Sequence, residues 1–327
     1  MGMKIGVIGL GYWGPNILRN LISLDNVKIF AYDKDTKRME KIKRFYPSVV
    51  YVNSLEELLN NIDAVMIVTP VETHYKLAKA ALLKDKDVFV EKPLAISAKE
   101  AEELIRFADQ RSRILMVGHT FLFNPAVRKV KDLIESGELG DIYYISMTRI
   151  NLGIHRKDCN VIWDLASHDL SILYYWLEDE VEKVKAIGDD FSMKNGNIEV
   201  AFINLQFKKG AIANIHVSWL APNKVRNTIV VGSKKMVVYD DTNPQEKIKI
   251  YDAGIDILEE PKTFGEFLLT YRTGDIISPR IPAEEPLRLE VKHFLECIQS
   301  RKRPLTDAQE GLKIVKTLER IEKALYN

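Results

Sequence analysis

The segment from Lys4 to Asp33 constrains the fold of this chain more strongly than any other. It runs from an apolar strand into a Gly-x-Gly-x-x-Gly loop at residues 9–14, continues through a helical stretch, and ends with a second strand closed by an acid. A unit that binds a dinucleotide needs these residue types in this order. A glycine-rich turn in some other α/β unit is the alternative, but the strands, the helix and the acid all agree with dinucleotide binding.

The three glycines of the loop each have a physical reason. Gly9 permits the tight turn, Gly11 lets a pyrophosphate approach the backbone, and Gly14 allows the helix to pack closely on the strand. The helix N-terminus offers unpaired N–H groups to the phosphates. Pro15 suits the first turn, because its missing N–H would have no partner there.

The acid at the end of the second strand predicts which dinucleotide is bound. Asp33 stands where a carboxylate binds the ribose 2′-hydroxyl and would repel a 2′-phosphate. Lys34, Lys37 and Arg38 follow closely and could accept that phosphate instead. We therefore predict NAD as the cofactor, with NADP as the less favoured alternative, and we place Asp33 and Arg38 in the cofactor site.

Composition excludes several classes of function. The chain of 327 residues has 47 Lys and Arg against 46 Asp and Glu, so it offers no electrostatic case for nucleic acid or an anionic membrane. It has no apolar run of about 18–20 residues and no signal-peptide pattern. Cys159 and Cys297 lack the spacing of a paired motif, which favours a reduced, cytoplasmic setting.

The first third of the chain alternates strands and helices. Repeated βα units predict a doubly wound parallel sheet, and we assign residues 1–120 to a dinucleotide-binding Rossmann domain. Beyond Asp33, we expect strands at 49–52, 63–68, 87–90 and 114–117, and helices at 36–45, 73–83 and 97–110. Capping boxes at Ser54–Glu57 and Ser97–Glu100 mark two helix starts.

Residues 121–327 are predicted to form a second α/β domain for substrate binding and oligomerisation. Its strands alternate as in a large, open, mostly antiparallel sheet, and we expect them at 141–150, 181–188, 198–207, 211–219, 227–232, 236–239 and 247–251. We expect helices at 125–137, 163–176, 286–300 and 306–325; Thr306–Gln309 would cap the last, and the final two could pack back on the first domain. A subunit partner often covers such a free sheet face, so we expect a homodimer or homotetramer.

The Glu91-Lys92-Pro93 segment follows a predicted parallel strand, at the sheet edge where ligands bind. Pro93 lacks an N–H and favours an extended Lys92, which aims the side chain outward. A lysine beside bound nicotinamide can stabilise alkoxide character on a substrate hydroxyl. A surface lysine paired with Glu91 is the alternative.

Asp164 and His168 lie four residues apart on the predicted helix 163–176, so an α-helix puts both side chains on one face. A general base tuned by a carboxylate would explain them. The alternative is an acid that offsets the helix dipole and a core histidine with a satisfied hydrogen bond, and spacing alone favours it.

Other candidates rest on their positions near these motifs. Thr69, Pro70 and His74 follow a buried strand, and His74 could pack near nicotinamide or cap a helix. Tyr12 and Trp13 could shape the nicotinamide pocket or merely pack.

Substrate contacts are expected from a polar segment that precedes the Asp164 helix. Asn151, His155, Arg156 and Asn160 could hold sugar hydroxyls or a diphosphate, or form a solvated loop. We add Asn124 and Arg149 as further substrate candidates. We predict no metal site, because His155 and Cys159 gather no further ligands and no HExxH motif occurs.

Three motifs together resemble the Gfo/Idh/MocA oxidoreductase family: the glycine loop at 9–14, Glu91-Lys92-Pro93, and Asp164-x-x-x-His168. The resemblance covers nearly the whole chain. It implies a Rossmann domain followed by an α/β domain whose open sheet forms the oligomer interface. It also implies oxidation or reduction of a sugar or cyclitol carbon with NAD or NADP, with Lys92, Asp164 and His168 as the catalytic set.

Three segments look like a narrower branch that acts on nucleotide-linked sugars: residues 11–16, 160–169 and 271–275. Its typical members are 3-dehydrogenases of UDP-N-acetylglucosamine and of the related uronic acids. The likeness implies hydride removal from the sugar C3. A dehydrogenase of free sugars or inositol and an NAD-binding protein without turnover are the alternatives.

Overall fold

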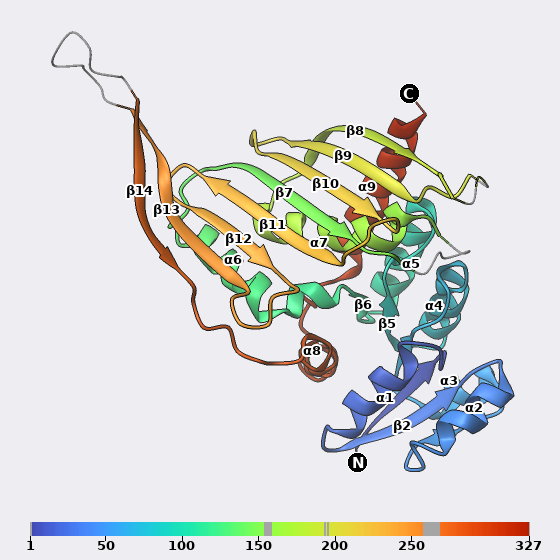
Figure 1. Ribbon diagram of the computed structural model, residues 1–327. Helices are drawn as coiled ribbons and strands as arrows, with labels where there is room; N and C mark the ends of the chain where they lie inside the picture. The colour runs from blue at the N-terminus through green and yellow to red at the C-terminus, as the bar shows by residue number, and fades with distance from the viewer. Residues whose placement is uncertain (1, 154–158, 193, 195, 258–268, 327) are drawn as a thin grey trace, which may run out of the picture. The chain divides into compact units, whose positions relative to one another are not determined.

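The computed structural model describes residues 2–153, 159–192, 194, 196–257 and 269–326 (Figure 1). The chain divides into two compact units. Unit 1 comprises Met1–Phe123 and Glu284–Glu319, and unit 2 comprises Asn124–Ala283 and Arg320–Asn327. Among the described residues, none of the helices combines the length and the apolar character that crossing a membrane requires.

Unit 1 is built on a six-stranded parallel sheet with the order β3-β2-β1-β4-β5-β6. The strands are β1 Met3–Ile8, β2 Val27–Tyr32, β3 Val50–Tyr51, β4 Ala64–Ile67, β5 Asp87–Glu91 and β6 Leu115–Gly118. Strands β4, β5 and β6 are buried along their whole length, as in a parallel sheet covered on both faces. This order is that of a doubly wound dinucleotide-binding sheet, which confirms the predicted fold class.

The helices of unit 1 begin where the sequence signals indicated. They are α1 Gly14–Ile22, α2 Thr36–Lys43, α3 Leu55–Asn61, α4 His74–Leu83, α5 Ala98–Gln110 and α8 Pro286–Ser300, with the 3₁₀ segments η1 Val71–Thr73 and η2 Thr120–Phe123. Helix α9, Ala308–Leu325, starts in unit 1. The hydroxyls of Ser54 and Ser97 each accept a hydrogen bond from the N–H three residues on, so both predicted caps are confirmed.

The predicted cap of α9 is wrong by one residue. The Oδ1 atom of Asp307 accepts the N–H of Glu310 at 3.0 Å, so Asp307 and not Thr306 caps the helix. The backbone carbonyl of Thr306 accepts the N–H of Val117 at 2.8 Å, which pairs this segment with β6. Sheet pairing thereby moves the helix start one residue along the chain.

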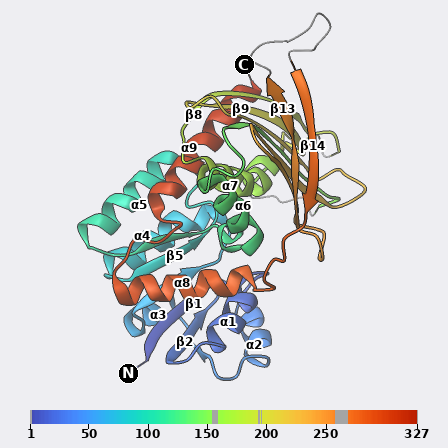
Figure 2. The ribbon, with the colours of Figure 1, turned by 90° about the vertical axis from the view of Figure 1, so that its left-hand side faces the viewer.

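Helix α8 belongs to the core of unit 1 although it lies far along the sequence. It packs on η2 and α1, and Figure 2 shows it lying across the middle of this unit. The rings of Phe89 and Phe294 are 5.7 Å apart, which joins α8 to the buried strand β5. Side chains of α8 therefore reach the carboxyl end of the parallel sheet.

Unit 2 contains an eight-stranded sheet with the order β14-β13-β12-β11-β7-β10-β9-β8. Only the pair β7 and β10 is parallel among the described strands, as the predicted mostly antiparallel sheet requires. The strands are β7 Ile142–Ile150, β8 Val181–Asp189, β9 Val200–Phe207, β10 Ile212–Ser218, β11 Val225–Gly232, β12 Met236–Asp240, β13 Ile248–Ile257 and β14 Leu269–Ile277.

Two elements of unit 2 differ from the prediction. Strand β13 continues past Tyr251. Strand β14 was not predicted, because Gly274 and the charged Arg272 and Asp275 interrupt its apolar pattern and its order comes from pairing with β13. The expected single helix 163–176 is a π-helical turn, Ile162–Ala166, followed by α7, Ser167–Leu177. The α-helical spacing argument therefore does not apply over the whole stretch.

The two faces of the second sheet are chemically different. Helices α6, Pro125–Glu135, and α7 lie against one face (Figure 1), where β9 buries Ala201, Ile203 and Leu205. On the opposite face Ile187 pairs with Phe202, and Ile212 pairs with Tyr144, and all four side chains are exposed. Ile229 is exposed on the same face. We name these five residues the open-face patch.

Candidate functional site

The loop between β1 and α1 has the geometry of a phosphate-binding loop. Gly9 has a φ of 96°, and a Cβ atom there would lie 2.7 Å from the carbonyl oxygen of Val68. A Cβ atom on Gly14 would lie 2.3 Å from the carbonyl oxygen of Gly9, so the close contact of Gly14 is with the loop backbone. A Cβ atom on Gly11 would meet nothing within 4 Å. The backbone at Gly11 is therefore open to a ligand.

The two aromatic residues of this loop are accessible. Tyr12 is 85 % exposed and Trp13 is 41 % exposed, and their rings meet edge to face at 5.7 Å. They do not pack into the core of unit 1. Their positions agree with contact to a bound molecule.

Asp33 binds the loop as well as the start of α2. Its Oδ2 atom accepts the N–H of Leu10 at 2.7 Å and a guanidinium N–H of Arg38 at 3.3 Å, and its Oδ1 atom accepts the N–H of Asp35 at 2.8 Å. An ionised carboxylate has about four acceptor positions, so about one is left for a ribose hydroxyl. Sequence spacing did not indicate that Asp33 also holds the loop backbone in place.

His74 connects the ends of two strands. Its imidazole is buried, with Nδ1 2.8 Å from the carbonyl oxygen of Pro93 and Nε2 2.8 Å from that of Thr69. The Thr69 hydroxyl lies 2.6 Å from the Thr73 hydroxyl. His74 therefore holds the segment after Lys92 against the end of β4 and does not cap the helix. Its expected place near nicotinamide stays a prediction.

Lys92 follows the last residue of β5, at the carboxyl end of the parallel sheet. Glu91 is buried, and its Oε2 atom accepts the backbone N–H of Lys92 at 3.2 Å. Pro70, which follows the end of β4, accepts the N–H of Thr73 through its carbonyl at 3.0 Å. Strands β4 and β5 are neighbours, so these segments share one sheet edge.

Two buried polar groups lie at the same edge. Burial, with a smaller effect of the Lys92 charge, lowers the pKa of His119 to about 3, so this imidazole is neutral. Burial, and then the charge of Glu91, raises the pKa of Glu290 well above its usual range. Glu290 was not among the candidates predicted from the sequence. The sequence does contain a sign that Glu290 is buried, because it lies in the apolar stripe of α8 beside Leu287 and Val291.

Asp164 and His168 lie at the junction of the π-helical turn and α7 in unit 2. Both are partly exposed, whereas most residues around them are buried. The carboxylate of Asp164 accepts the indole N–H of Trp219 at 3.3 Å, and the backbone carbonyl of His168 accepts the hydroxyl of Ser171 at 2.7 Å. Both predicted catalytic residues of unit 2 are therefore partly accessible.

Asn160 caps the helical segment that carries Asp164. Its Oδ1 atom accepts the N–H groups of Ile162 and Trp163, each at 3.1 Å, and its Nδ2 atom donates to Glu322 at 2.8 Å. We predicted substrate contact for Asn160, and the structure shows that its amide fixes the start of the π-helical turn.

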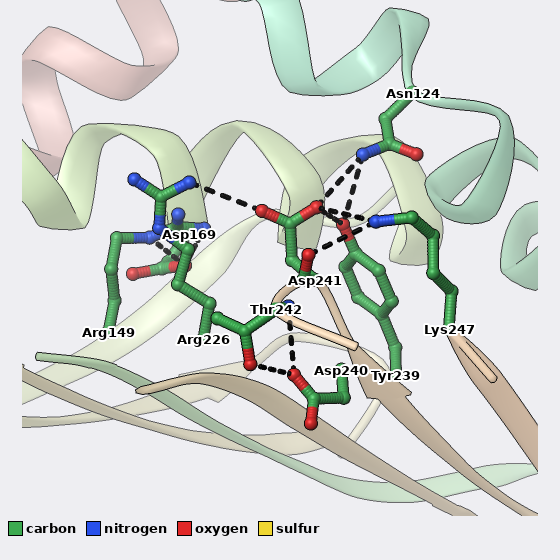
Figure 3. Close-up of polar contacts among 9 residues, drawn as sticks. All are labelled: Asn124, Arg149, Asp169, Arg226, Tyr239, Asp240, Asp241, Thr242 and Lys247. Carbon is green, nitrogen blue, oxygen red and sulfur yellow. Dashed lines mark hydrogen bonds and ion pairs between the residues drawn. The ribbon is translucent and has the colours of Figure 1, made fainter. Parts of the chain in front are cut away.

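Two more predicted substrate residues belong to the polar cluster of Figure 3. Arg149 donates through Nε and Nη2 to Oδ1 of Asp169, at 3.0 and 2.7 Å, and both side chains are buried. Asn124 caps α6 and donates to the hydroxyl of Tyr239 and to Asp241, each at 3.2 Å. Both side chains hold unit 2 together, a role that sequence position does not distinguish from substrate binding.

Electrostatics in this cluster follow from burial. Burial raises the pKa of Asp169, and the opposing effect of Arg149 does not cancel it. Burial acts the same way on Asp241, but the Tyr239 hydrogen bond and the charges of Lys247 and Arg226 outweigh it and lower the pKa of Asp241.

The remaining predicted residues give no site of their own. Asn151 is partly buried, and its backbone N–H donates to the carbonyl of Ser218 at 3.1 Å. His155 and Arg156 lie outside the described residues. Within the described ranges, no three His, Cys, Asp or Glu side chains come together as metal ligands would.

Sequence comparison matches both parts of the chain to one family. Residues 3–119 match the description "Oxidoreductase family, NAD-binding Rossmann fold", and residues 127–238 match "GFO/IDH/MocA C-terminal domain". The chain is 26 % identical over 321 residues to myo-inositol 2-dehydrogenase of Thermotoga maritima, covering 94 % of this chain and 92 % of that protein.

A second relative is named for a sugar nucleotide. The chain is 27 % identical over 258 residues to UDP-N-acetylglucosamine 3-dehydrogenase of Acidithiobacillus ferrooxidans, covering 77 % of this chain and 78 % of that protein. The solved structure of the enzyme of that name from the same organism has the same fold, with a TM-score of 0.83 and 23 % identity over 99 % of this chain and 98 % of that chain. With its phosphate-binding loop, parallel sheet and open second sheet, the chain belongs to the Gfo/Idh/MocA family of NAD-binding oxidoreductases.

Proposed function

We propose that this protein is an NAD-dependent dehydrogenase that oxidises C3 of a nucleotide-linked sugar, such as UDP-N-acetylglucosamine or its uronic acid. The observation that carries the proposal is the partly exposed pair Asp164 and His168, which an Asn160-capped π-helical turn presents in unit 2. π-Helical turns are rare and are frequent at functional sites. The relative named for UDP-N-acetylglucosamine supports the choice of substrate.

The proposed mechanism gives each residue one role. His168 removes the proton of the substrate hydroxyl, and Lys92 stabilises the alkoxide that develops on the same oxygen. Asp164 holds the sugar ring. The bound dinucleotide supplies the hydride acceptor, and the phosphate loop holds it.

The environment of Asp33 supports NAD as the cofactor. A 2′-phosphate would stand beside this buried carboxylate, and the nearby Arg38 is already engaged by Asp33 and Asp35. Its positive charge is therefore largely offset. We expect the dissociation constant for NAD to be at least tenfold lower than that for NADP in a fluorescence titration.

The open-face patch supports a homo-oligomer. Five large apolar side chains on one sheet face are a typical surface for a second subunit. We expect a dimer or tetramer by light scattering, and we expect Phe202→Lys to shift the mass toward the monomer. An unchanged mass would exclude the centre of this face from the interface.

The test of the proposed function is NADH formation with a panel of substrates. UDP-N-acetylglucosamine, its uronic acid, UDP-glucose, dTDP-glucose, free N-acetylglucosamine and myo-inositol are compared under identical conditions. Turnover of the UDP-sugars supports the proposal. Turnover of inositol alone favours the second candidate, which the myo-inositol 2-dehydrogenase relative suggests, and no turnover favours a protein that binds NAD without catalysis.

Substitutions then test the roles of the residues. Lys92→Ala is expected to lower kcat about 10²–10³-fold, as the loss of an oxyanion-stabilising group does, with unchanged NAD binding. His168→Ala is expected to remove the acidic limb of the pH–rate profile. The exposed Lys99→Ala serves as the matched control. Wild-type turnover in the Lys92 variant contradicts its role, and an unaltered pH profile excludes His168 as the base.

A further inference from the structure

Trp219 is a buried aromatic residue that directly follows β10 in unit 2. Its side chain is 1 % exposed, and its indole Nε1–H donates to Oδ2 of Asp164 at 3.3 Å. A buried tryptophan usually has a hydrogen-bond partner for its indole N–H. Here that partner is the partly exposed carboxylate that holds the sugar ring in the proposed mechanism. Trp219 therefore joins the core of unit 2 to a proposed catalytic side chain.

The backbone of Trp219 is held on both sides by the ends of neighbouring strands. Its N–H donates to the carbonyl of Glu199 at 2.9 Å, and its carbonyl accepts the N–H of Gly153 at 2.9 Å. Glu199 precedes β9 and Gly153 follows β7, and these two strands pair with β10. The two hydrogen bonds continue this pairing beyond the strand ends, so the sheet sets the position of Trp219.

Gly153 leaves the space that the indole occupies. A Cβ atom on Gly153 would lie 2.9 Å from Cδ1 of Trp219 and 3.3 Å from its Cγ. The indole ring is rigid, and Cδ1 is bonded directly to the donor Nε1. A side chain at position 153 would therefore displace the ring together with its N–H group.

The backbone of Asp164 is held as well. Its N–H donates to the carbonyl of Asn160 at 3.0 Å, in the π-helical turn that the Asn160 side chain caps. Strand β10 packs on this turn. The turn thus sets where the carboxylate lies, and the indole N–H acts on its orientation. Orientation matters for catalysis, because a small misplacement of a substrate-binding group lowers the rate.

We propose that Trp219 is a positioning residue for Asp164: its indole N–H orients the carboxylate that holds the sugar ring. The inference rests on the proposed role of Asp164 in sugar oxidation. Hydrogen bonds to charged groups are stronger than those between neutral groups. Loss of the indole N–H removes a contact that orients the carboxylate, so the sugar ring is held less well and kcat/KM falls.

The experiment compares Trp219→Phe with Trp176→Phe in the full-length protein. Trp176 is the matched control, because it is also 1 % exposed and lies in unit 2, but its indole N–H donates to the backbone carbonyl of Val127 at 2.9 Å. Each change removes one buried indole N–H and the same side-chain volume. Both changes are made in the wild type and in Asp164→Ala. NADH formation with UDP-N-acetylglucosamine, urea unfolding and the dissociation constant for NAD are measured for every protein.

We expect Trp219→Phe to lower kcat/KM about tenfold or more, chiefly through a higher KM, as the loss of a hydrogen bond to a charged group does. In the Asp164→Ala background the same change is expected to alter kcat/KM by less than about twofold, because the group that Trp219 orients is absent. Trp176→Phe is expected to alter kcat/KM by less than about twofold in the wild type, although both tryptophan variants lower the urea midpoint. The dissociation constant for NAD is expected to be unchanged.

Gly153→Ala is a second variant that keeps the indole N–H but displaces the ring. It is expected to lower kcat/KM in the wild type and to leave it unchanged in the Asp164→Ala background. This variant tests the inference even if Trp219→Phe does not fold.

Two results overturn the inference while sugar oxidation persists: a wild-type kcat/KM in Trp219→Phe, or an equal loss in the wild type and in the Asp164→Ala background. The second result would show that Trp219 acts on the fold and not through Asp164. Failure of the proposed function gives a different result. If the wild type oxidises no sugar, or if Asp164→Ala is as active as the wild type, the role of Asp164 fails and the positioning role fails with it.

Discussion

The buried pair Arg149 and Asp169 allows a quantitative prediction. Asp169→Leu leaves the Arg149 guanidinium buried and removes two charge-assisted hydrogen bonds, each worth about 1.5–3 kcal/mol. Both side chains are less than a tenth exposed, so water does not replace the lost partner. We expect the free energy of unfolding to fall by about 3–5 kcal/mol, the usual cost of breaking a buried pair.

Removing both charges is expected to lower the free energy of unfolding much less than removing one. Burial raises the pKa of Asp169 despite its partner, whereas the attraction of Asp169 outweighs burial and raises the pKa of Arg149, so attraction and desolvation nearly offset each other in the pair. Arg149→Met combined with Asp169→Leu should therefore recover most of the stability that either single change loses. The expected coupling free energy is about 3 kcal/mol or more.

The assay is urea unfolding followed by tryptophan fluorescence. Trp163, Trp176 and Trp219 lie in unit 2, so the signal reports chiefly on the unit that contains the pair. Glu180→Gln, which breaks an exposed pair with Lys208 in the same unit, is the control and should change stability by less than about 1 kcal/mol. A cost below about 1 kcal/mol for Asp169→Leu, or a double variant as unstable as the sum of the singles, would refute the reasoning.

Three further predictions concern unit 1. Gly14→Ala should weaken NAD binding at least tenfold and lower the melting temperature, because the Cβ atom of the new alanine would lie 2.3 Å from a backbone oxygen. Gly11→Ala should weaken NAD binding without loss of stability, because a Cβ atom there meets nothing within 4 Å. NAD titrations and thermal melts compare the two variants. The pKa of His119 falls from 6.5 to about 3 on folding, so the folded protein binds fewer protons than the unfolded chain and stability is lost as pH falls below 6.5. Urea unfolding at pH 7 and pH 5 should therefore show that His119→Phe removes about 2 kcal/mol of acid destabilisation; an equal loss in both proteins would contradict this. His74→Ala should lower stability by about 1–3 kcal/mol, because a neutral imidazole donates one N–H and a carbonyl of Pro93 or Thr69 loses that donor, and an unchanged urea midpoint would show that neither contact matters.

Much of the fold could be predicted because its signals are local. The phosphate loop depends on glycines at fixed spacing, and the parallel strands are continuous apolar runs such as residues 64–67. The caps Ser54 and Ser97 need only a partner three residues away. The cap of α9 could not be predicted in the same way, because the backbone of Thr306 pairs with β6, a strand distant in sequence.

The errors in unit 2 have the same origin. Strand β14 exists because β13 supplies its hydrogen bonds, and its own sequence has little apolar alternation. The π-helical turn at Ile162–Ala166 depends on a cap from Asn160, whose amide also binds Glu322 near the C-terminus. The periodicity of the local sequence indicates neither the pairing with β13 nor the contact with Glu322.

Candidate residues were harder to assign than elements, because residue type does not identify the partner. Arg149 and Asn124 were candidates for substrate contact, and their partners proved to be Asp169 and Asp241 of the same unit. Glu290 was overlooked although an acid within an apolar helical stripe is a visible signal. Burial and partner together separate these cases, and both require coordinates.

At the start of α7, one residue stabilises the structure and the adjacent residue is proposed to take part in catalysis. Consecutive side chains of an α-helix point about 100° apart. Asp169 therefore faces inward, where it binds Arg149, while its neighbour His168 is partly exposed. The pair Arg149 and Asp169 anchors α7 on β7 and thereby fixes the direction of His168. If this division is correct, His168→Ala lowers turnover and removes the acidic limb of its pH profile at little cost in stability, whereas Asp169→Leu lowers both turnover and stability. The contrast between adjacent positions distinguishes a group that reacts from a group that holds it.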